Sequence, residues 1–416
     1  MSAATDVPRK PAMLSLDDAI ERLLGQVSAP APERAERIST FDALGRVLAE
    51  DVRSLIDVPP ADNSEMDGYA LAVADVAAPG TVLRVSQRIA AGSVGSALEP
   101  GWAARNFTGA QVPAGADAVV MQELCSAVDG GVRIDASPTP GQSIRRRGED
   151  VHKGATVLRA GLRLAPQALG MAASVGAATL RVGARPRVAL FSTGDELAMP
   201  GEVLKPGAIY NSNRFTLRGL IQALGGVCED LGIVPDRLDA TQETLRRAAA
   251  GNDLIVTCGG MSVGEEDHMK PAVEQEGRLD MWQIAIKPGK PLAFGEVARG
   301  DGSSAWFIGL PGNPVSAFVT FLFAVRPVLL RLQGATDLAP RPIAMRADFA
   351  WPRADRRREF LRVRRKADGG LELFPNQGSA VLTSTTWGDG LVDNPGGMTI
   401  APGDTVRYLP FAELLR

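Results

Sequence analysis

Apolar residues recur at helical spacing near the start of the chain. Ser15 followed by Asp18 resembles a capping box, and the amphipathic run behind it ends at the prolines of residues 29–32. The apolar positions of this run are Leu16, Ala19, Ile20, Leu23, Leu24 and Val27. The spacing predicts a helix. A shorter helical segment is expected at residues 43–49, followed by an extended stretch at residues 52–60.

Short alternating runs mark two other parts of the chain. Between residues 63 and 150, segments such as 81–85 alternate and are separated by glycines, which predicts a small β domain. Residues 165–178 are interpreted as a helix that packs on the first helices. Beyond residue 334, segments such as 360–363 alternate again. They predict a second β module.

The most regular pattern lies between these β regions. Apolar segments predict strands at residues 188–191, 231–234, 254–257, 283–286 and 305–308. Helical stretches or loops separate them, which is typical of a mostly parallel sheet with ligand-binding loops at the carboxyl ends of its strands. Asn313 at an N-cap and Pro314 in a first turn predict a final helix over residues 315–332.

Length, composition and charge exclude several classes of protein. The 416 residues exceed the roughly 250–300 that one core supports, so we expect several domains. With 45% hydrophobic residues and no run near the ~20 apolar residues of a membrane span, we expect a soluble protein that binds no membrane. The net charge, 45 − 48 = −3, provides no basic field for nucleic acid.

Cysteine and histidine are few. Cys125, Cys228 and Cys258 are odd in number and lack a Cys-x-x-Cys spacing, which argues against a disulfide framework and a thiolate zinc site. A reducing cytoplasm fits this usage. With His152 and His268 as the two histidines, neither a His-based zinc site nor a Ser-His-Asp triad is expected.

Four loops that contain glycine or proline follow predicted strands of the sheet. They occupy residues 192–196, 259–264, 287–291 and 310–316. Each alone could be an ordinary turn or helix start. Because the loops are predicted at the carboxyl edge of one sheet, we expect them to converge on a single ligand site.

The residue types in these loops suit a phosphate or oxyanion. Backbone N–H groups of the glycine loop can converge on an anion, and the start of the last helix adds the positive end of its dipole. Lys287 and Lys290 can bind an oxyanion. Asp195, Glu196 and the acidic residues 265–267 could hold Mg²⁺ against a phosphate.

Other charged or polar residues near these motifs have simpler interpretations. Residues 145–147, Arg356 and Arg357 are cations that more often belong to a solvated surface than to a ligand site. His268 is assigned no catalytic role. Cys258 is interpreted as a small buried residue.

Seven segments, taken together, resemble those of the molybdopterin molybdenumtransferase (MoeA) family and the related gephyrin E-domain. They are NSEMDGYA at 63–70, TGA at 108–110, RRGED at 146–150, STGDE at 192–196, GGMSVG at 259–264, IKPGKP at 286–291 and PGNPVS at 311–316. The resemblance runs from about Leu14 to the C-terminus. Each match alone would be weak, but their shared order makes the resemblance specific.

The resemblance implies an elongated homodimer with a multidomain α/β plus β fold. The implied parts are a helical and extended dimerisation segment (14–62 and 151–183), an inserted β domain (63–150), a molybdopterin-binding α/β domain with a mostly parallel sheet (184–334) and a C-terminal β-barrel-like domain (335–416). The ligand cleft would lie between the α/β domain of one protomer and the inserted β domain of the other.

The same resemblance implies an enzyme that performs the last step of molybdenum cofactor biosynthesis. This transferase would use adenylated molybdopterin, molybdate and Mg²⁺, and would release molybdenum cofactor and AMP. The cytoplasm is the expected location. The molybdopterin adenylyltransferase and the recipient molybdoenzymes could be further partners.

Motif correspondence also implies the site residues. The catalytic set would be Asp67, Thr108, Glu196, Asp236 and Asp267, of which Glu196, Asp236 and Asp267 would hold the metal. Asp67 and Thr108 would complete a site built mainly by the loops of the partner protomer. The substrate-binding set would be Gly259, Gly260, Ser262, Gly264, Lys287, Lys290, Pro311, Gly312, Asn313, Pro314 and Ser316.

Two residues depart from the family pattern, and two rival functions stay open. Glu65 stands where a small residue is common, and His268 is unexpected after Asp267; both leave substrate details and pH response open. One rival is a scaffold that binds a receptor tail, as the gephyrin E-domain does. The other is an adenylyltransferase that attaches AMP to molybdopterin. The charged loops favour the molybdenumtransferase, and the two β domains count against the adenylyltransferase.

Overall fold

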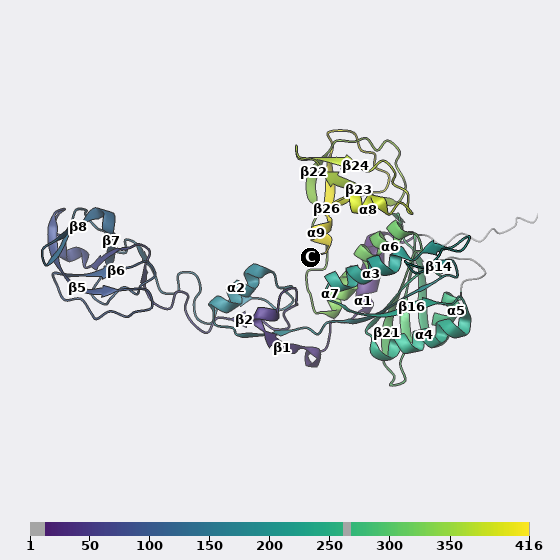
Figure 1. The fold of residues 1–416 in the computed structure, drawn as a ribbon, viewed down its shortest axis with the longest axis horizontal. Helices are drawn as coiled ribbons and strands as arrows, with labels where there is room; N and C mark the ends of the chain where they lie inside the picture. The colour runs from purple at the N-terminus through teal and green to yellow at the C-terminus, as the bar shows by residue number, and fades with distance from the viewer. Residues whose placement is uncertain (1–12, 261–267, 416) are drawn as a thin grey trace, which may run out of the picture.

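The computed structural model describes residues 13–260 and 268–415. Figure 1 shows an elongated chain with a β sheet at one end, a narrow middle segment, and an α/β body beside a second β body at the other end. Three sheets of six strands form the larger bodies. The structure therefore confirms the predicted combination of one α/β part with two β parts.

The first predicted helix is present as α1 (Leu16–Gln26). The Ser15 hydroxyl oxygen accepts the backbone N–H of Asp18 at 3.0 Å, so its start is capped as predicted. The buried face of α1 joins the core of the α/β body and contacts α7 (Arg326–Leu332).

The middle segment is built from two stretches of chain that pair with each other. β1 (Glu36–Ser39) pairs antiparallel with β12 (Thr179–Val182), and β2 (Val52–Arg53) pairs antiparallel with β11 (Thr156–Leu158). The predicted helix at 165–178 is present in shorter form as α2 (Pro166–Ser174). Its buried residues share a small core with these paired strands.

Two expectations for this segment are wrong. Residues 43–49 are not a helix: the 3₁₀ turn η2 (Thr40–Asp42) precedes them, and Val47 and Leu48 form β bridges with Arg163 and Val182. Short apolar runs can fill a helix face or a paired strand equally well, so spacing alone cannot separate the two. The packing of α2 on the first helix is also wrong, because α1 belongs to the α/β core instead.

The inserted sheet has the strand order β7-β4-β6-β5-β9-β8. Its elements are β4 (Gly68–Leu71), η3 (Val73–Asp75), β5 (Thr81–Ile89), β6 (Trp102–Asn106), β7 (Ala118–Met121), η4 (Gln122–Leu124), β8 (Cys125–Val128) and β9 (Gly131–Ile134). The chain enters and leaves through a paired neck, where β3 (Asn63–Ser64) pairs with β10 (Ile144–Arg145) and Val58 bridges to Val151. The predicted small β part is confirmed.

The central sheet has the order β16-β13-β17-β21-β20-β18. Its strands are β13 (Arg187–Thr193), β16 (Val227–Val234), β17 (Leu254–Cys258), β18 (Gly277–Gln283), β20 (Pro291–Ala298) and β21 (Ser304–Leu310), and its helices are α3 (Ser212–Ala223), α4 (Leu238–Gly251) and α5 (Met269–Glu276). The first four strands in this order are parallel, and β20 runs antiparallel to both of its neighbours, β21 and β18. The prediction of a mostly parallel sheet is correct.

The predicted strand at 283–286 is wrong. These residues join the end of β18 to a two-residue strand, β19 (Ile286–Lys287), which does not belong to the central sheet. β19 pairs with β23 (Arg358–Arg365) of the C-terminal body, with Lys287 opposite Glu359. The lysine loop is therefore positioned by a strand far along the chain.

The final helix begins after Asn313, as predicted, although the Asn313 side chain makes no capping hydrogen bond. It runs through α6 (Pro314–Thr320), the π-helical η5 (Phe321–Val325) and α7. By length and composition this helix could cross a membrane, contrary to the expectation from the sequence. However, 83% of its most apolar 18 residues are buried inside the protein. Such burial is typical of a core helix.

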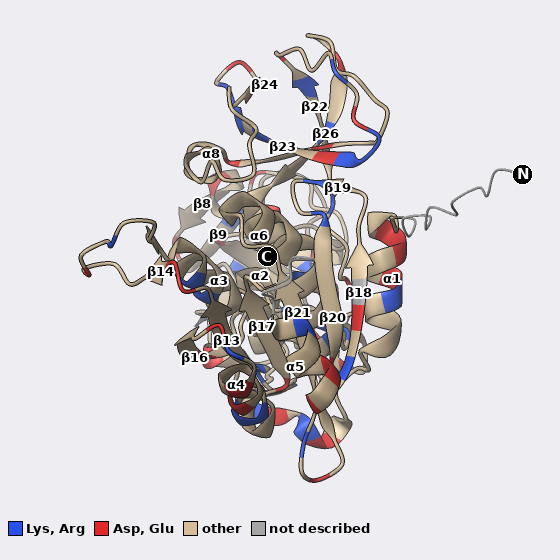
Figure 2. Cartoon of the chain, turned by 90° about the vertical axis from the view of Figure 1, so that its right-hand side faces the viewer, with Lys and Arg blue, Asp and Glu red and all other residues tan. Residues whose placement is uncertain are grey.

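The C-terminal strands close into a barrel. β23 pairs with both β24 and β25, which completes the ring β23-β24-β22-β26-β25. The remaining elements are β22 (Ile343–Ala347), β24 (Gly370–Leu373), α8 (Thr383–Trp387), β25 (Gly390–Asn394), β26 (Thr405–Pro410) and α9 (Phe411–Leu414). The predicted barrel-like part is thus confirmed. Figure 2 shows Lys and Arg interspersed with Asp and Glu across this end of the molecule.

Candidate functional site

All four predicted loops contribute to one cavity of about 1000 Å³. It lies where β13, β17 and β21 end, together with the loop after β19. Its lining includes Thr193, Gly194, Glu196, Asp236, Gly259, Gly260, residues 287–291, Pro311, Gly312, Asn313 and Ser316. Pro314 lines an adjoining cavity of about 520 Å³. The structure therefore brings most of the predicted substrate-binding residues together.

Close backbone contact holds the first two loops at this edge. Gly259 has φ +96°, and a Cβ added there would lie 2.6 Å from the Thr193 carbonyl oxygen. A larger residue would clash with backbone that cannot move aside, so glycine is required at this position. Ser262, Gly264 and Asp267, predicted to continue this loop, lie outside the described residues.

Cys258, directly before Gly259, is a structural thiol. Its Sγ donates to the Pro311 carbonyl at 3.1 Å and accepts from the Asn213 amide at 3.0 Å. Burial raises the pKa of Cys258 to about 12. The thiol therefore stays protonated at neutral pH, which agrees with its interpretation as a small buried residue.

Two acidic side chains face the cavity. Glu196 is exposed and Asp236 is half-buried, and both line the cavity wall. The Asp195 carboxylate accepts the Asp236 backbone N–H at 3.4 Å, which links the two loops. Within the described ranges, neither Glu196 nor Asp236 has a Lys or Arg ion-pair partner, and no three acidic, His or Cys residues cluster as a complete metal site. Two unpaired carboxylates suit a hard cation that keeps much of its water.

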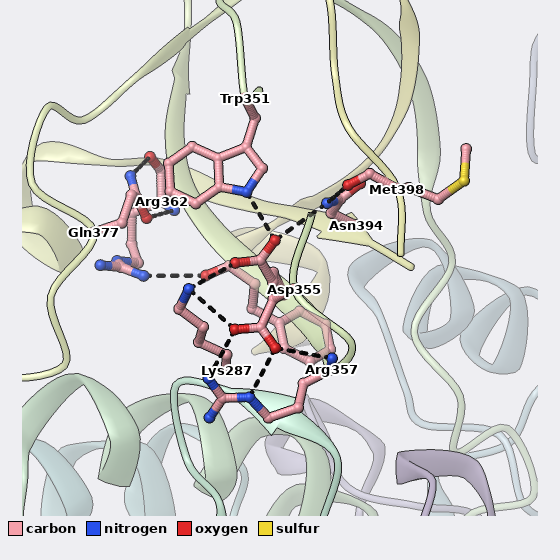
Figure 3. A network of polar contacts seen from close by, with 10 residues as sticks. Lys287, Trp351, Asp355, Arg357, Arg362, Gln377, Asn394 and Met398 are labelled. Carbon is pink, nitrogen blue, oxygen red and sulfur yellow. Dashed lines mark hydrogen bonds and ion pairs between the residues drawn. The ribbon is translucent and has the colours of Figure 1, made fainter. Parts of the chain in front are cut away.

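Three cations face the same cavity. Lys290 is exposed on its wall, and Lys287 and Arg357 lie beside it. Lys287 Nζ lies 3.3 Å from Asp355, and the Arg357 guanidinium lies 2.8 Å from the same carboxylate (Figure 3). The Arg357 hydrogen bond, aided by Lys287, holds the pKa of Asp355 well below its usual range. Asp355 is thus an anion at neutral pH.

Glu359 supplies the second anchor of Lys287. Its carboxylate is 1% exposed and lies 3.0 Å from Lys287 Nζ. Trp351 Nε1 donates to it at 2.7 Å, and Asn394 Nδ2 donates at 3.4 Å (Figure 3). These bonds offset part of the cost of burying the charge.

The barrel also supplies a loop to the cavity wall, at residues 377–379. The Gln377 side chain donates to the Arg362 carbonyl at 3.0 Å and accepts its N–H at 2.9 Å. The buried Arg362 guanidinium donates to the Gly378 carbonyl at 3.2 Å. The sequence did not predict residues 377–379 as part of the cavity wall, and Arg357 was interpreted as a surface residue. Both contacts depend on the pairing of β19 with β23, which lie far apart in the chain, so no local spacing indicates them.

Asp67 and Thr108 lie apart from the cavity in the same chain. Asp67 directly precedes β4 and Thr108 follows β6, two strands of the inserted sheet, which lies at the other end of the molecule (Figure 1). The Thr108 backbone N–H and hydroxyl donate to Asp67 Oδ1 at 2.8 and 2.9 Å. These bonds, led by the backbone N–H, lower the pKa of Asp67.

The arginines at 145–147 make surface ion pairs, as the simpler interpretation predicted. Their partners are Glu65 at 3.9 Å, Asp62 at 2.6 Å and Asp57 at 2.7 Å. The unusual Glu65 therefore faces Arg145. His268 stands at the N-cap of α5.

The chain matches three family models in order. They are described as the MoeA N-terminal region (domain I and II) over residues 14–176, a probable molybdopterin binding domain over 189–331, and the MoeA C-terminal region (domain IV) over 344–411.

Similar proteins cover nearly the whole chain. A molybdopterin molybdenumtransferase of Haemophilus influenzae is 38% identical over 97% of this chain and 100% of its own length. The crystal structure of a molybdopterin biosynthesis moeA protein from Pyrococcus horikoshii matches with TM-score 0.83 and 28% identity, over 96% of this chain and all of that one. Gephyrin of Dictyostelium discoideum is 32% identical over 77% of this chain and 50% of its own length.

At pH 8, Cys258 is expected to react with iodoacetamide about a thousandfold more slowly than an exposed thiol, because its raised pKa leaves little thiolate. The rate should rise about tenfold with each pH unit and level off near the folded pKa. Timed alkylation followed by peptide mass spectrometry measures this rate, with the half-buried Cys125 as an internal comparison. Labelling of Cys258 at the rate of a free thiol would contradict the structural role.

Proposed function

Since the chain belongs to the molybdopterin molybdenumtransferase family, we propose that it inserts molybdenum from molybdate into adenylated molybdopterin and releases molybdenum cofactor and AMP. It is an enzyme of molybdenum cofactor biosynthesis. The single observation that carries the finer proposal is that unpaired carboxylates, a glycine loop and three cations share one cavity.

The cations suit the oxyanion groups of both substrates. Lys287 and Lys290 present point charges to an oxygen, whereas the planar guanidinium of Arg357 can bind two oxygens at once. Ser316 and the start of α6 lie on the same wall, where the helix dipole favours an anion. We assign these residues to molybdate and to the phosphate groups of the adenylated substrate.

Glu196 and Asp236 would hold Mg²⁺, with Asp267 as the third ligand implied by the motif. We infer that Mg²⁺ fits here because Glu196 and Asp236 have no cationic partner in the described chain and face the cavity beside Lys287. When bound, Mg²⁺ neutralises phosphate charge and polarises the phosphoryl oxygens.

The protein residues contribute alignment and electrostatic stabilisation to the reaction. Charge that develops on phosphate oxygens meets ammonium and guanidinium groups that are already in place. Soft sulfur ligands for molybdenum come from the substrate dithiolate, so the enzyme requires no cysteine. The buried, protonated Cys258 agrees with this division of roles.

We further propose a homodimer in which each cavity is completed by the inserted sheet of the other protomer. Asp67 and Thr108 lie far from the cavity of their own chain, so they can join such a site only across two chains. The proposed setting is the cytoplasm, with the adenylyltransferase and recipient molybdoenzymes as further partners. A scaffold role is less favoured, because it would not require charged loops around a cavity. ATP and free molybdopterin should yield no pyrophosphate.

Lys290→Ala is expected to lower kcat/KM for molybdate about 10- to 100-fold, because it removes a charged hydrogen-bond donor from the cavity wall. AMP release and reactivation of an apo-molybdoenzyme measure the effect. Lys270→Ala is the matched control, since Lys270 is exposed and lies 4.0 Å from Glu274 on α5. Unchanged turnover at limiting molybdate would remove Lys290 from the site.

Asp236→Asn is expected to raise the Mg²⁺ concentration for half-maximal turnover about tenfold or more, because it removes a ligand charge. Asp239→Asn is the control: Asp239 lies three residues away but pairs with Arg237 at 2.6 Å. A Mg²⁺ titration of AMP release measures both. Equal Mg²⁺ dependence in the two variants would contradict the metal assignment.

Mixing Asp67→Asn and Glu196→Gln protomers is expected to restore activity when each variant alone is inactive. In a shared-site dimer, half of the randomly mixed dimers carry one intact site, which predicts about a quarter of wild-type turnover. The mixture is denatured and refolded together, then assayed. No recovery despite formation of mixed dimers would show that the two residues do not act at one shared site.

A further inference from the structure

Two carboxylates of the C-terminal body contact the cations of the cavity, and they differ in setting. Glu359 is the acidic residue of β23 and is 1% exposed. Asp355 lies in the loop before β23, and its side chain is 20% exposed. Both contact Lys287 Nζ, at 3.0 and 3.3 Å (Figure 3).

Glu359 is held through both carboxylate oxygens, Oε2 by hydrogen bonds and Oε1 by its ion pair with Lys287. Sheet pairing places it opposite Lys287, and Trp351 and Asn394 donate hydrogen bonds to its carboxylate. A charge buried in this way keeps its partner in place, because separating the pair would leave the carboxylate without its counter-charge. Lys287 is thereby held at the cavity wall.

Asp355 contacts two cations that an incoming anion would also contact. It contacts Lys287 and also the Arg357 guanidinium, at 2.8 Å. Both cations line the cavity, and neither Asp355 nor Glu359 does; of the two carboxylates, Asp355 is the more exposed. Asp355 accepts hydrogen bonds from Arg357 Nε and Nη2, and a bound oxyanion would require the same donors.

We propose that the two carboxylates act on oxyanion binding in opposite directions. Glu359 is a positioning residue that holds the Lys287 ammonium toward the cavity, and Asp355 is an internal anion that competes with molybdate for Lys287 and Arg357. This inference rests on the proposed function, because it takes these cations to be the oxyanion site.

The substitutions Glu359→Gln and Asp355→Asn keep the shapes of the two side chains and remove their charges. Glu359→Gln should weaken molybdate binding about tenfold, because Lys287 loses its fixed partner. Asp355→Asn should tighten it about threefold, because a partly exposed competing charge is removed. In turnover, both changes should appear in KM for molybdate more than in kcat.

Calorimetry with molybdate alone measures binding to the full-length wild type and to each variant. Glu359→Gln is also combined with Lys287→Ala, where its effect on molybdate affinity should disappear if it acts through Lys287. Asp393→Asn is the matched control: this carboxylate is 0% exposed and pairs with Arg358 at 2.5 Å. The control should change folding stability but not molybdate affinity.

The outcomes separate this inference from the proposed function. If the wild type turns over adenylated substrate but both variants shift molybdate affinity in the same direction, the inference is wrong and the function stands. An effect of Glu359→Gln that persists without Lys287, or that Asp393→Asn reproduces, also overturns it. If the wild type neither binds molybdate nor releases AMP, the proposed function itself is wrong.

Discussion

The ion pair between partly exposed Lys287 and buried Glu359 links the lysine loop to the barrel, and the α/β body and the barrel also share one apolar core. Burying a charge is costly unless its partner and its remaining hydrogen bonds are supplied, and here Lys287, Trp351 and Asn394 supply them. The short β19–β23 pairing carries the same connection through the backbone. The lysine loop and the barrel are therefore positioned as one unit, and the wall of the cavity depends on both.

The rest of the cavity follows from sheet geometry. Parallel strands deliver their loops to one edge, and the close approach of Gly259 to the Thr193 carbonyl brings two of those loops together. In the described chain, Glu196, Asp236 and Lys290 line this cavity without an ion-pair partner, whereas Lys287 and Arg357 pair with carboxylates outside its lining. An arrangement of this kind suits ligands that carry both a cation and phosphate.

Local spacing was sufficient to predict α1, the parallel strands and the convergence of the three loops that follow β13, β17 and β21, because each depends on neighbouring residues or on one edge rule. It was insufficient where burial comes from distant pairing. Val47 and Leu48 resembled a helix face, yet they bridge to residues more than 100 positions away. The strand expected at 283–286 failed for the same reason, as did the surface interpretation of Arg357. The site residues implied by motif alone stay predictions.

The neck below the inserted sheet has a consequence for assembly. Its two legs run antiparallel and are joined at β2–β11, at Val58 with Val151, and at β3–β10. Bends and turns separate these joints, and the joints hold the two legs side by side at matched positions. Insertions would have to occur in both legs together to lengthen the neck. In the proposed homodimer, the length of the neck would set how far the inserted sheet of one protomer reaches toward the cavity of the other.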